Sequence, residues 1–129
     1  MSTYNNVLVV LDPSVEQQKA LNRAIELTRL QGGKLTAFLS VYDFSYEMTT
    51  MLSGEERESM RQAVIKDREL WISELTERHR AAGLNIVIKV VWHSRPFEAI
   101  VHAVLEDNYD LVIKGTHDHD VLKSMIFTP

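Results

Sequence analysis

The chain has 129 residues, with 45% apolar and 25% charged side chains, a formal net charge of −4 and no cysteine. This length and composition suit one globular domain, and they exclude disulfides, thiol catalysis and zinc-thiolate sites. The negative charge argues against nucleic acid as a partner, because sequence-independent binding of DNA or RNA depends on clustered Lys and Arg. No apolar run approaches a membrane span and no signal pattern is present, so we expect a cytoplasmic protein without a membrane partner.

The first half of the chain predicts a strand, a helix and a second strand. Residues 7–11 form a continuous apolar, β-branched run, which is typical of a strand covered on both faces of a parallel sheet. Ser14 and Gln17 fit a capping box for a helix that Gly32 and Gly33 would end. A second strand is expected over 35–42.

A long helix and a third strand are predicted next, after an apolar-rich connection without a clean period. Ser53 and Glu56 form another capping box, and the helix that they begin would run to Gly83. The strand after it is expected over 85–92. The connection over 43–52 is interpreted as a loop that packs against the core.

The last third of the chain predicts another helix and strand, followed by a brief final helix. Pro96 suits the first turn of the helix. Its inner face would consist of apolar residues at helical spacing: Ile100, Val101, Val104 and Leu105. A fourth strand is expected over 110–114, and the apolar residues of 121–126 suggest a short helix.

Strands and helices therefore alternate, which predicts an α/β fold with an open, mostly parallel sheet and helices on both faces. In such sheets, ligands bind at the carboxyl ends of the strands, near helix amino termini. The polar residues expected at this edge are Asp12, His93 and Lys114. Lys114 lacks the rest of a P-loop and is interpreted as an ordinary residue at a strand end.

Several segments resemble the universal stress protein family. They are Val-Val-Leu-Asp12, the helix opening Arg-Pro-Phe-Glu-Ala-Ile over 95–100, and Asp-Leu-Val-Ile-Lys-Gly-Thr-His over 110–117. The segments 42–50 and 89–93 are most similar to the first domain of tandem, two-domain members. The resemblance implies one universal stress protein domain over residues 1–129, the first of two. It also implies a chain truncated before the domain's last helix and fifth strand.

ATP-binding members of the family wrap the ribose and phosphates with Gly-x-x-Gly, a nine-residue spacer, then Gly-Ser or Gly-Thr. By this resemblance Gly115 fits the first position, but Asp118, Thr128 and Pro129 occupy the other three. Proline has no amide hydrogen to donate, and a carboxylate about 4 Å from a phosphate oxygen costs on the order of 4 kcal/mol. We therefore expect no cofactor, with ATP disfavoured.

If a nucleotide does bind, the resemblance implies that Asp12 approaches the adenine or ribose, Val41 lies beside the base and Gly115 lies near the sugar. The alternative for Asp12 is that it caps the first helix, and the sequence favours neither reading. His117 and His119, with the acids between and after them, are weak candidates for metal ligands, and His93 from the neighbouring loop is a further candidate ligand. A solvated polar loop is the preferred interpretation, so no metal is expected.

The sequence contains no nucleophile elbow, no His-Glu-x-x-His and no Gly-x-Gly-x-x-Gly, so we expect no enzymatic activity. The predicted function is a stress-response module with a degenerate ATP-binding loop, which acts by pairing with a second such domain or a homodimer mate. A sheet that ends at its fourth strand would leave an open edge for that partner. The alternative is a regulatory nucleotide-binding domain, assisted by a metal. A nucleotide hydrolase or nucleotidyl transferase ranks last. The histidine signature that transferases of the wider superfamily carry after the first strand is missing here.

Overall fold

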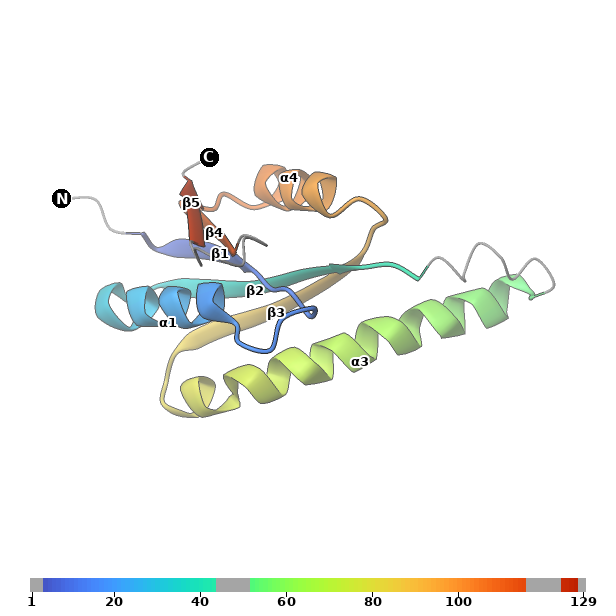
Figure 1. Ribbon diagram of the computed structural model, residues 1–129, viewed down its shortest axis with the longest axis horizontal. Coiled ribbons are helices and arrows are strands. Elements are labelled where there is room, and N and C mark those ends of the chain that lie inside the picture. The colour runs from blue at the N-terminus through green and yellow to red at the C-terminus, as the bar shows by residue number, and fades with distance from the viewer. Residues whose placement is uncertain (1–3, 44–51, 116–123, 128–129) are drawn as a thin grey trace.

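The computed structural model describes residues 4–43, 52–115 and 124–127. Within these ranges the chain forms a single sheet with the strand order β3-β2-β1-β4-β5 (Figure 1). Four strands are parallel: β1 (Asn6–Val10), β2 (Lys34–Val41), β3 (Asn85–Trp92) and β4 (Leu111–Gly115). The fifth, β5 (Ser124–Phe127), is antiparallel to β4. The predicted α/β class and mostly parallel sheet are confirmed.

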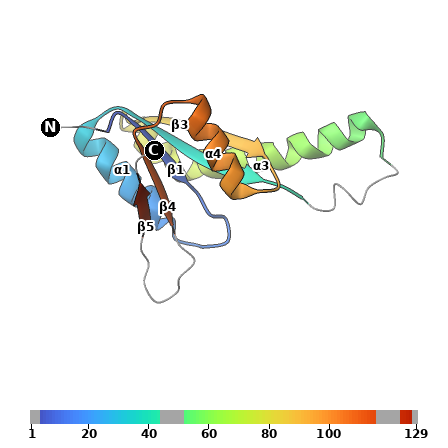
Figure 2. The same ribbon diagram turned by 90° about the horizontal axis from the view of Figure 1, so that it is seen from above.

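Helices cover both faces of the sheet, as predicted (Figures 1 and 2). On one face lie α1 (Lys19–Gln31) and α3 (Gly54–Ala81), and on the other lies α4 (Pro96–Glu106). The first face has the larger core, which includes Val7, Val9 and Ile72. The second core joins β1, β2 and β4 to α4 through a smaller set of buried residues: Leu8, Phe38, Ala99, Ile100, Ala103, Tyr109 and Val112.

The order of the strands creates a switch point between β1 and β4. From β1 the chain moves outward to β2 and β3, and then crosses back to β4 on the other side of β1. The connections on the two sides of this point therefore leave in opposite directions, which opens a crevice at the carboxyl ends of β1 and β4. The fold places Asp12 and Gly115 at these two strand ends.

The last described segment is a strand, so the helix predicted over 121–126 is wrong. Ser124–Phe127 pairs with β4, in a register that sets Ser124 opposite Gly115 and Phe127 opposite Val112. Pairing with the unsatisfied backbone groups of β4 outweighs the local apolar pattern on which the helix prediction depended. The expected open edge at the fourth strand is wrong for the same reason, because β5 covers it.

The start of the first helix also differs from the prediction. Its first residue is Lys19 and its N-cap is Gln18, without a side-chain cap, so the capping box of Ser14 and Gln17 is wrong. The Ser14 hydroxyl instead donates to Asp12 Oδ1 at 2.6 Å. The buried Gln18 amide holds the loop together, accepting from Asp12 N at 3.1 Å and donating to Asp12 O at 2.6 Å.

The long helix α3 begins and ends as predicted. Ser53 Oγ accepts from Glu56 N at 3.1 Å and Ser53 N donates to Glu56 Oε1 at 3.1 Å, which completes the capping box. The helix stops two residues before Gly83, whose φ is +102°. Neither α3, with 28 residues, nor either of the other described helices has an apolar stretch that could cross a membrane.

The inner face of α4 was predicted only in part. Pro96 lies in its first turn, as expected, and Ile100 is buried between two small residues, Ala99 and Ala103. These three residues form the face of α4 that packs on the sheet, so Val101 and Leu105 lie on the other side of the helix. Their side chains are 43% and 77% exposed, so their assignment to the inner face is wrong.

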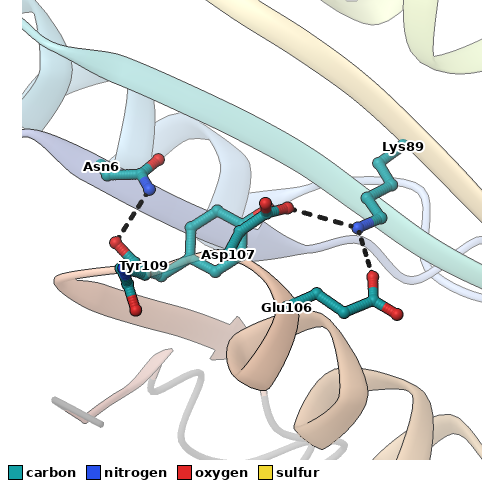
Figure 3. Close-up of polar contacts among 6 residues, drawn as sticks. Asn6, Lys89, Glu106, Asp107 and Tyr109 are labelled. Carbon is teal, nitrogen blue, oxygen red and sulfur yellow. Dashed lines mark hydrogen bonds and ion pairs between the residues drawn. The ribbon is translucent and has the colours of Figure 1, made fainter.

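A polar network holds the connection between α4 and β4 against the sheet (Figure 3). Lys89 Nζ lies 3.5 Å from Glu106 Oε2 and 3.5 Å from Asp107 Oδ2, and the Tyr109 hydroxyl donates to Asp107 Oδ2 at 3.3 Å. Asn6 Nδ2 donates to the main-chain oxygen of Asn108 at 2.9 Å. Burial is the main cause that raises the pKa of the Tyr109 hydroxyl. The network thereby fixes where β4 starts, and so where Gly115 ends it.

The first residue of the Asp-Leu-Val-Ile-Lys-Gly segment has a structural role. Asp110 Oδ2 accepts from Asn5 N and Asn6 N, each at 3.0 Å, and Asp110 N donates to Asn6 O at 2.7 Å. The carboxylate thus satisfies two backbone donors at the start of β1 and sets the register between β1 and β4.

Candidate functional site

A cleft of about 210 Å³ lies at the carboxyl ends of β1 and β4, against the start of α4. Asp12 and Gly115 both line it, so two of the three residues predicted for nucleotide contact are brought together by the fold. The other polar side chains of the lining are Ser40 and Lys114, and the apolar walls include Ile100. The cleft occupies the switch point, where α/β sheets bind their ligands.

Asp12 shapes the loop after β1 rather than a helix terminus. Its Oδ1 accepts from Ser14 N at 2.9 Å and from the Ser14 hydroxyl at 2.6 Å, which closes a tight turn at Pro13. Because α1 begins only at Lys19, the alternative that Asp12 caps this helix is wrong. The side chain is half-buried and stands at the wall of the cleft.

Val41, the third predicted contact, lies in a neighbouring cleft on the other side of Ser40. This second cleft has a volume of about 520 Å³ and is also lined by Tyr42, Asp43 and Arg68. Ser40 and Pro13 line both clefts, so the two are adjacent. Val41 is only 8% exposed, so it offers a ligand little surface.

Aromatic rings lie beside this second cleft. The rings of Tyr42 and Trp92 lie 5.2 Å apart at an angle of 51°, and the Arg68 guanidinium lies 5.8 Å from the Trp71 ring. The contact between Tyr42 and Trp92 joins the carboxyl ends of β2 and β3. The rest of the connection predicted over 43–52 lies largely outside the described residues, because 44–51 are not among them.

His93 is engaged in the turn that leads into α4. Its Nδ1 accepts from Arg95 N at 2.9 Å, its Nε2 lies 3.9 Å from Glu98 Oε2, and its ring meets that of His102 edge-on at 5.6 Å. In the described part of the chain no three His, Asp or Glu side chains gather as metal ligands. The weak metal candidates His117 and His119 lie outside the described residues, as does Asp118.

Lys114 was expected at this edge of the sheet but was given no role there. It was interpreted as an ordinary lysine at a strand end, and the structure shows that it lines the same cleft as Asp12 and Gly115. The alternation of side chains along β4 was the signal that could have found it. Lys114 is two residues after Val112, which packs into the core on the α4 side, so both side chains point to that face.

Comparison with known proteins identifies the family to which this fold and cleft belong. A sequence model described as "Universal stress protein family" matches residues 3–129. The chain belongs to the universal stress protein family. It is 54% identical over all of its 129 residues to the N-terminal part of "Universal stress protein E" of Escherichia coli K12. It is 43% identical over 130 aligned positions, 98% of the chain, to a "Universal stress protein E homolog" of Haemophilus influenzae.

The chain spans 41% of the Escherichia coli universal stress protein E and 42% of the Haemophilus influenzae homologue. Among solved structures it resembles "Universal stress protein UspA from Lactobacillus plantarum", with a TM-score of 0.61 and 21% sequence identity. That match covers 94% of this chain and 86% of the other chain. At this identity the likeness shows a shared universal stress protein fold.

By the resemblance stated above, the phosphate-binding loop is expected to begin at Gly115, where β4 ends. The predicted departures from its pattern, Asp118, Thr128 and Pro129, lie outside the described residues. Residues 124–127, which belong to the spacer of the pattern, form β5 and pair with β4 from Val112 to Gly115.

Proposed function

We propose that this universal stress protein domain is a non-enzymatic module of the stress response whose phosphate-binding loop has degenerated. It acts by pairing, as the first of two such domains in a longer cytoplasmic protein or with a second copy of itself. The observation that carries the first part is in the sequence after Gly115, the one glycine that is retained: Asp118, Thr128 and Pro129 stand at the other three positions of the family's pattern.

The residues at the later positions of the family's pattern support a loop that does not serve phosphate. A phosphate-binding loop needs backbone amides that are free to point at the anion. Pro129 lacks an amide hydrogen altogether, and the carboxylate of Asp118 would repel a phosphate. The pairing of β5 with β4 engages the spacer of the pattern and its first glycine, because Ser124 lies opposite Gly115.

The position of Val41 supports the same proposal. The cleft that contains Asp12 and Gly115 has a volume of about 210 Å³, so a nucleoside triphosphate would have to extend into the adjacent cleft of about 520 Å³. Val41, which would contact the base, is buried in the wall of the adjacent cleft.

An apolar stripe on α4 supports pairing. Phe97, Val101 and Leu105 are spaced by one helical turn and are 70%, 43% and 77% exposed. Exposed apolar patches of this kind mark surfaces that contact another protein. A second domain is one occupant consistent with the length of the tandem relatives, of which this chain spans 41%.

Calorimetric titration with ATP and Mg²⁺ tests the degenerate loop. We expect no saturable heat at micromolar concentrations for the chain as it stands. The triple variant Asp118→Gly, Thr128→Gly, Pro129→Ser rebuilds the family's pattern and is expected to gain affinity. Micromolar binding by the unaltered chain would refute the proposal, and an unimproved triple variant would show that the three departures are not the cause.

Size-exclusion chromatography with light scattering tests the pairing. The chain is expected to self-associate on concentration, and the variant Phe97→Ser, Leu105→Ser is expected to shift it toward the monomer. Leu30→Ser is the matched control, because Leu30 is an equally exposed leucine, at 85%, on α1. A monomer at every concentration, or an equal effect of the control, would contradict pairing through α4.

A regulatory nucleotide-binding domain is the second candidate, since the fold brings Asp12 and Gly115 to one cleft at the switch point. A bridging cation would offset the charge of Asp118. Nucleotide that co-purifies with the chain, is released by acid and depends on a divalent metal would favour this function over the first.

A further inference from the structure

The strand β3 forms one edge of the sheet and pairs only with β2 (Figure 1). Edge strands of natural proteins are usually short, or carry charges, prolines or bulges that prevent another strand from adding to them. In contrast, β3 has eight residues, contains no proline and keeps an unbroken parallel register with β2 from Asn85 to Trp92. Its one charged residue is Lys89. The sequence of β3 therefore does little to protect its outer edge.

The backbone groups of alternate residues of β3 point to this outer edge. His93 N donates to Val41 O at 2.9 Å, so the N–H and C=O groups of the odd-numbered residues point toward β2. Those of Ile86, Ile88 and Val90 then point away from the sheet. Among the described residues, no second strand and no side chain bonds to these three. They are donors and acceptors that a further strand can use.

The side chains of β3 suit a second apolar strand. Val91 packs against the core on the α4 side of the sheet, and Val87 and Lys89 share that face. Val87 is 40% exposed there. The Lys89 ammonium lies 3.5 Å from a carboxylate oxygen of both Glu106 and Asp107, so its charge is already compensated within the chain (Figure 3). Two copies of this strand can therefore lie side by side without strong repulsion between their lysines.

We infer that the outer edge of β3 binds the same edge of a second copy of the chain, as an antiparallel pair with a two-fold axis at Ile88. This register sets Ile86 opposite Val90, and each pair of residues whose backbone groups face the edge exchanges two hydrogen bonds. Val87 lies opposite Lys89 of the second copy. An axis at Lys89 is disfavoured, because it would set two ammonium groups opposite each other. The inference shares only the identity of the partner with the proposed function, since its surface is the edge of β3 and not the stripe on α4.

Disulfide crosslinking tests the register, because the chain has no cysteine of its own. Cα atoms of a hydrogen-bonded antiparallel pair lie about 5.5 Å apart, which a disulfide can bridge, so oxidation of Ile88→Cys is expected to give a covalent dimer. Val90→Cys is the matched control, since Val90 is also half-buried and lies on the same face. In this register its two copies would be more than about 13 Å apart, beyond the reach of a disulfide. A dimer that forms equally in both variants, or in neither, would overturn the inference.

Substitutions of Val87, made together with Ile88→Cys, test the cross-strand neighbour. Val87→Lys sets an ammonium group opposite Lys89 of the second copy and is expected to weaken association by up to about thirtyfold, because the axis repeats the pair. Val87→Glu sets a carboxylate there and is expected to retain the dimer. Equal effects of the two variants, with native circular dichroism, would overturn the inference. The variant Phe97→Ser, Leu105→Ser is expected to leave this crosslink unchanged, so failure of pairing through α4 is distinguished from failure at β3.

Discussion

Replacement of Gly33 by alanine should destabilise the domain far more than the same change at the preceding glycine. Both residues have positive φ, +78° at Gly32 and +88° at Gly33, where alanine costs about 1–2 kcal/mol. A Cβ at Gly32 would meet nothing within 4 Å, whereas at Gly33 it would lie 2.8 Å from Asn5 Cα and 2.9 Å from Asn5 C. The neighbour is backbone, so it cannot move aside as a flexible side chain would.

The added cost at Gly33 can be worked out from what must shift. Overpacking of this kind costs about 1–3 kcal/mol. Displacing Asn5 also weakens the 2.8 Å bond from Lys34 N to Asn5 O, which joins the starts of β1 and β2. We therefore expect Gly33→Ala to cost about 2–5 kcal/mol and Gly32→Ala about 1–2 kcal/mol.

Urea denaturation followed by circular dichroism measures both variants, and thermal melting checks them independently. For a domain of this size, each kcal/mol corresponds to about 4 °C in melting temperature. Equal losses of stability in the two variants would refute the reasoning, because they would show that contact with Asn5 contributes nothing beyond the strain of positive φ.

Four further outcomes are expected. Asp110→Ala removes the acceptor of two backbone N–H groups at the start of β1 and should lower the free energy of unfolding by about 1–2 kcal/mol in urea titrations; an unchanged midpoint would contradict this. Because the pKa of Tyr109 is raised in the folded state, its contribution to stability should be complete below about pH 10 and decline as the pH rises further. This alkaline loss should be smaller in Tyr109→Phe, and an identical pH profile would argue against a buried neutral hydroxyl. Ser53→Ala should cost about 0.5–2 kcal/mol and speed hydrogen exchange in the first turn of α3, whereas unaltered exchange there would contradict the capping box. Added zinc should leave the melting temperature unchanged, since His117 and His119 are expected to form a solvated loop; a rise would support a metal site.

Much of the fold could be predicted because the structure favoured by neighbouring residues is also the one that each segment adopts in the folded chain. The run over 85–92 is a strand with those bounds, and the other parallel strands begin and end within one residue of the prediction. The capping box at Ser53 is present, and Gly32 and Gly33 have the positive φ expected after a helix. Each of these local signals agrees with the environment that the folded chain provides, so nothing in the tertiary structure opposed it.

Which of the predicted site residues lie together could not be read from the sequence, because they come from strands that are distant in sequence. Asp12 and Gly115 were both predicted for the site, from the resemblance, and the fold brings them to one cleft. Lys114 was expected at this edge but interpreted as an ordinary strand-end residue, and only the packing of β4 against the α4 side shows that it lines the same cleft. Val41 was predicted beside a ligand, but burial in the larger core leaves it 8% exposed.

The sequence by itself determined the alternation of strands and helices, the parallel sheet and the family, because these follow from short periodic patterns and contiguous motifs. Only the tertiary structure decided which side of α4 faces the sheet, where α1 begins and that Ser124–Phe127 is a strand. In each of those cases a contact in the folded chain overrode the local pattern: the sheet beneath Ala99 and Ala103, the hydrogen bonds of the buried Gln18 amide, and the pairing edge of β4.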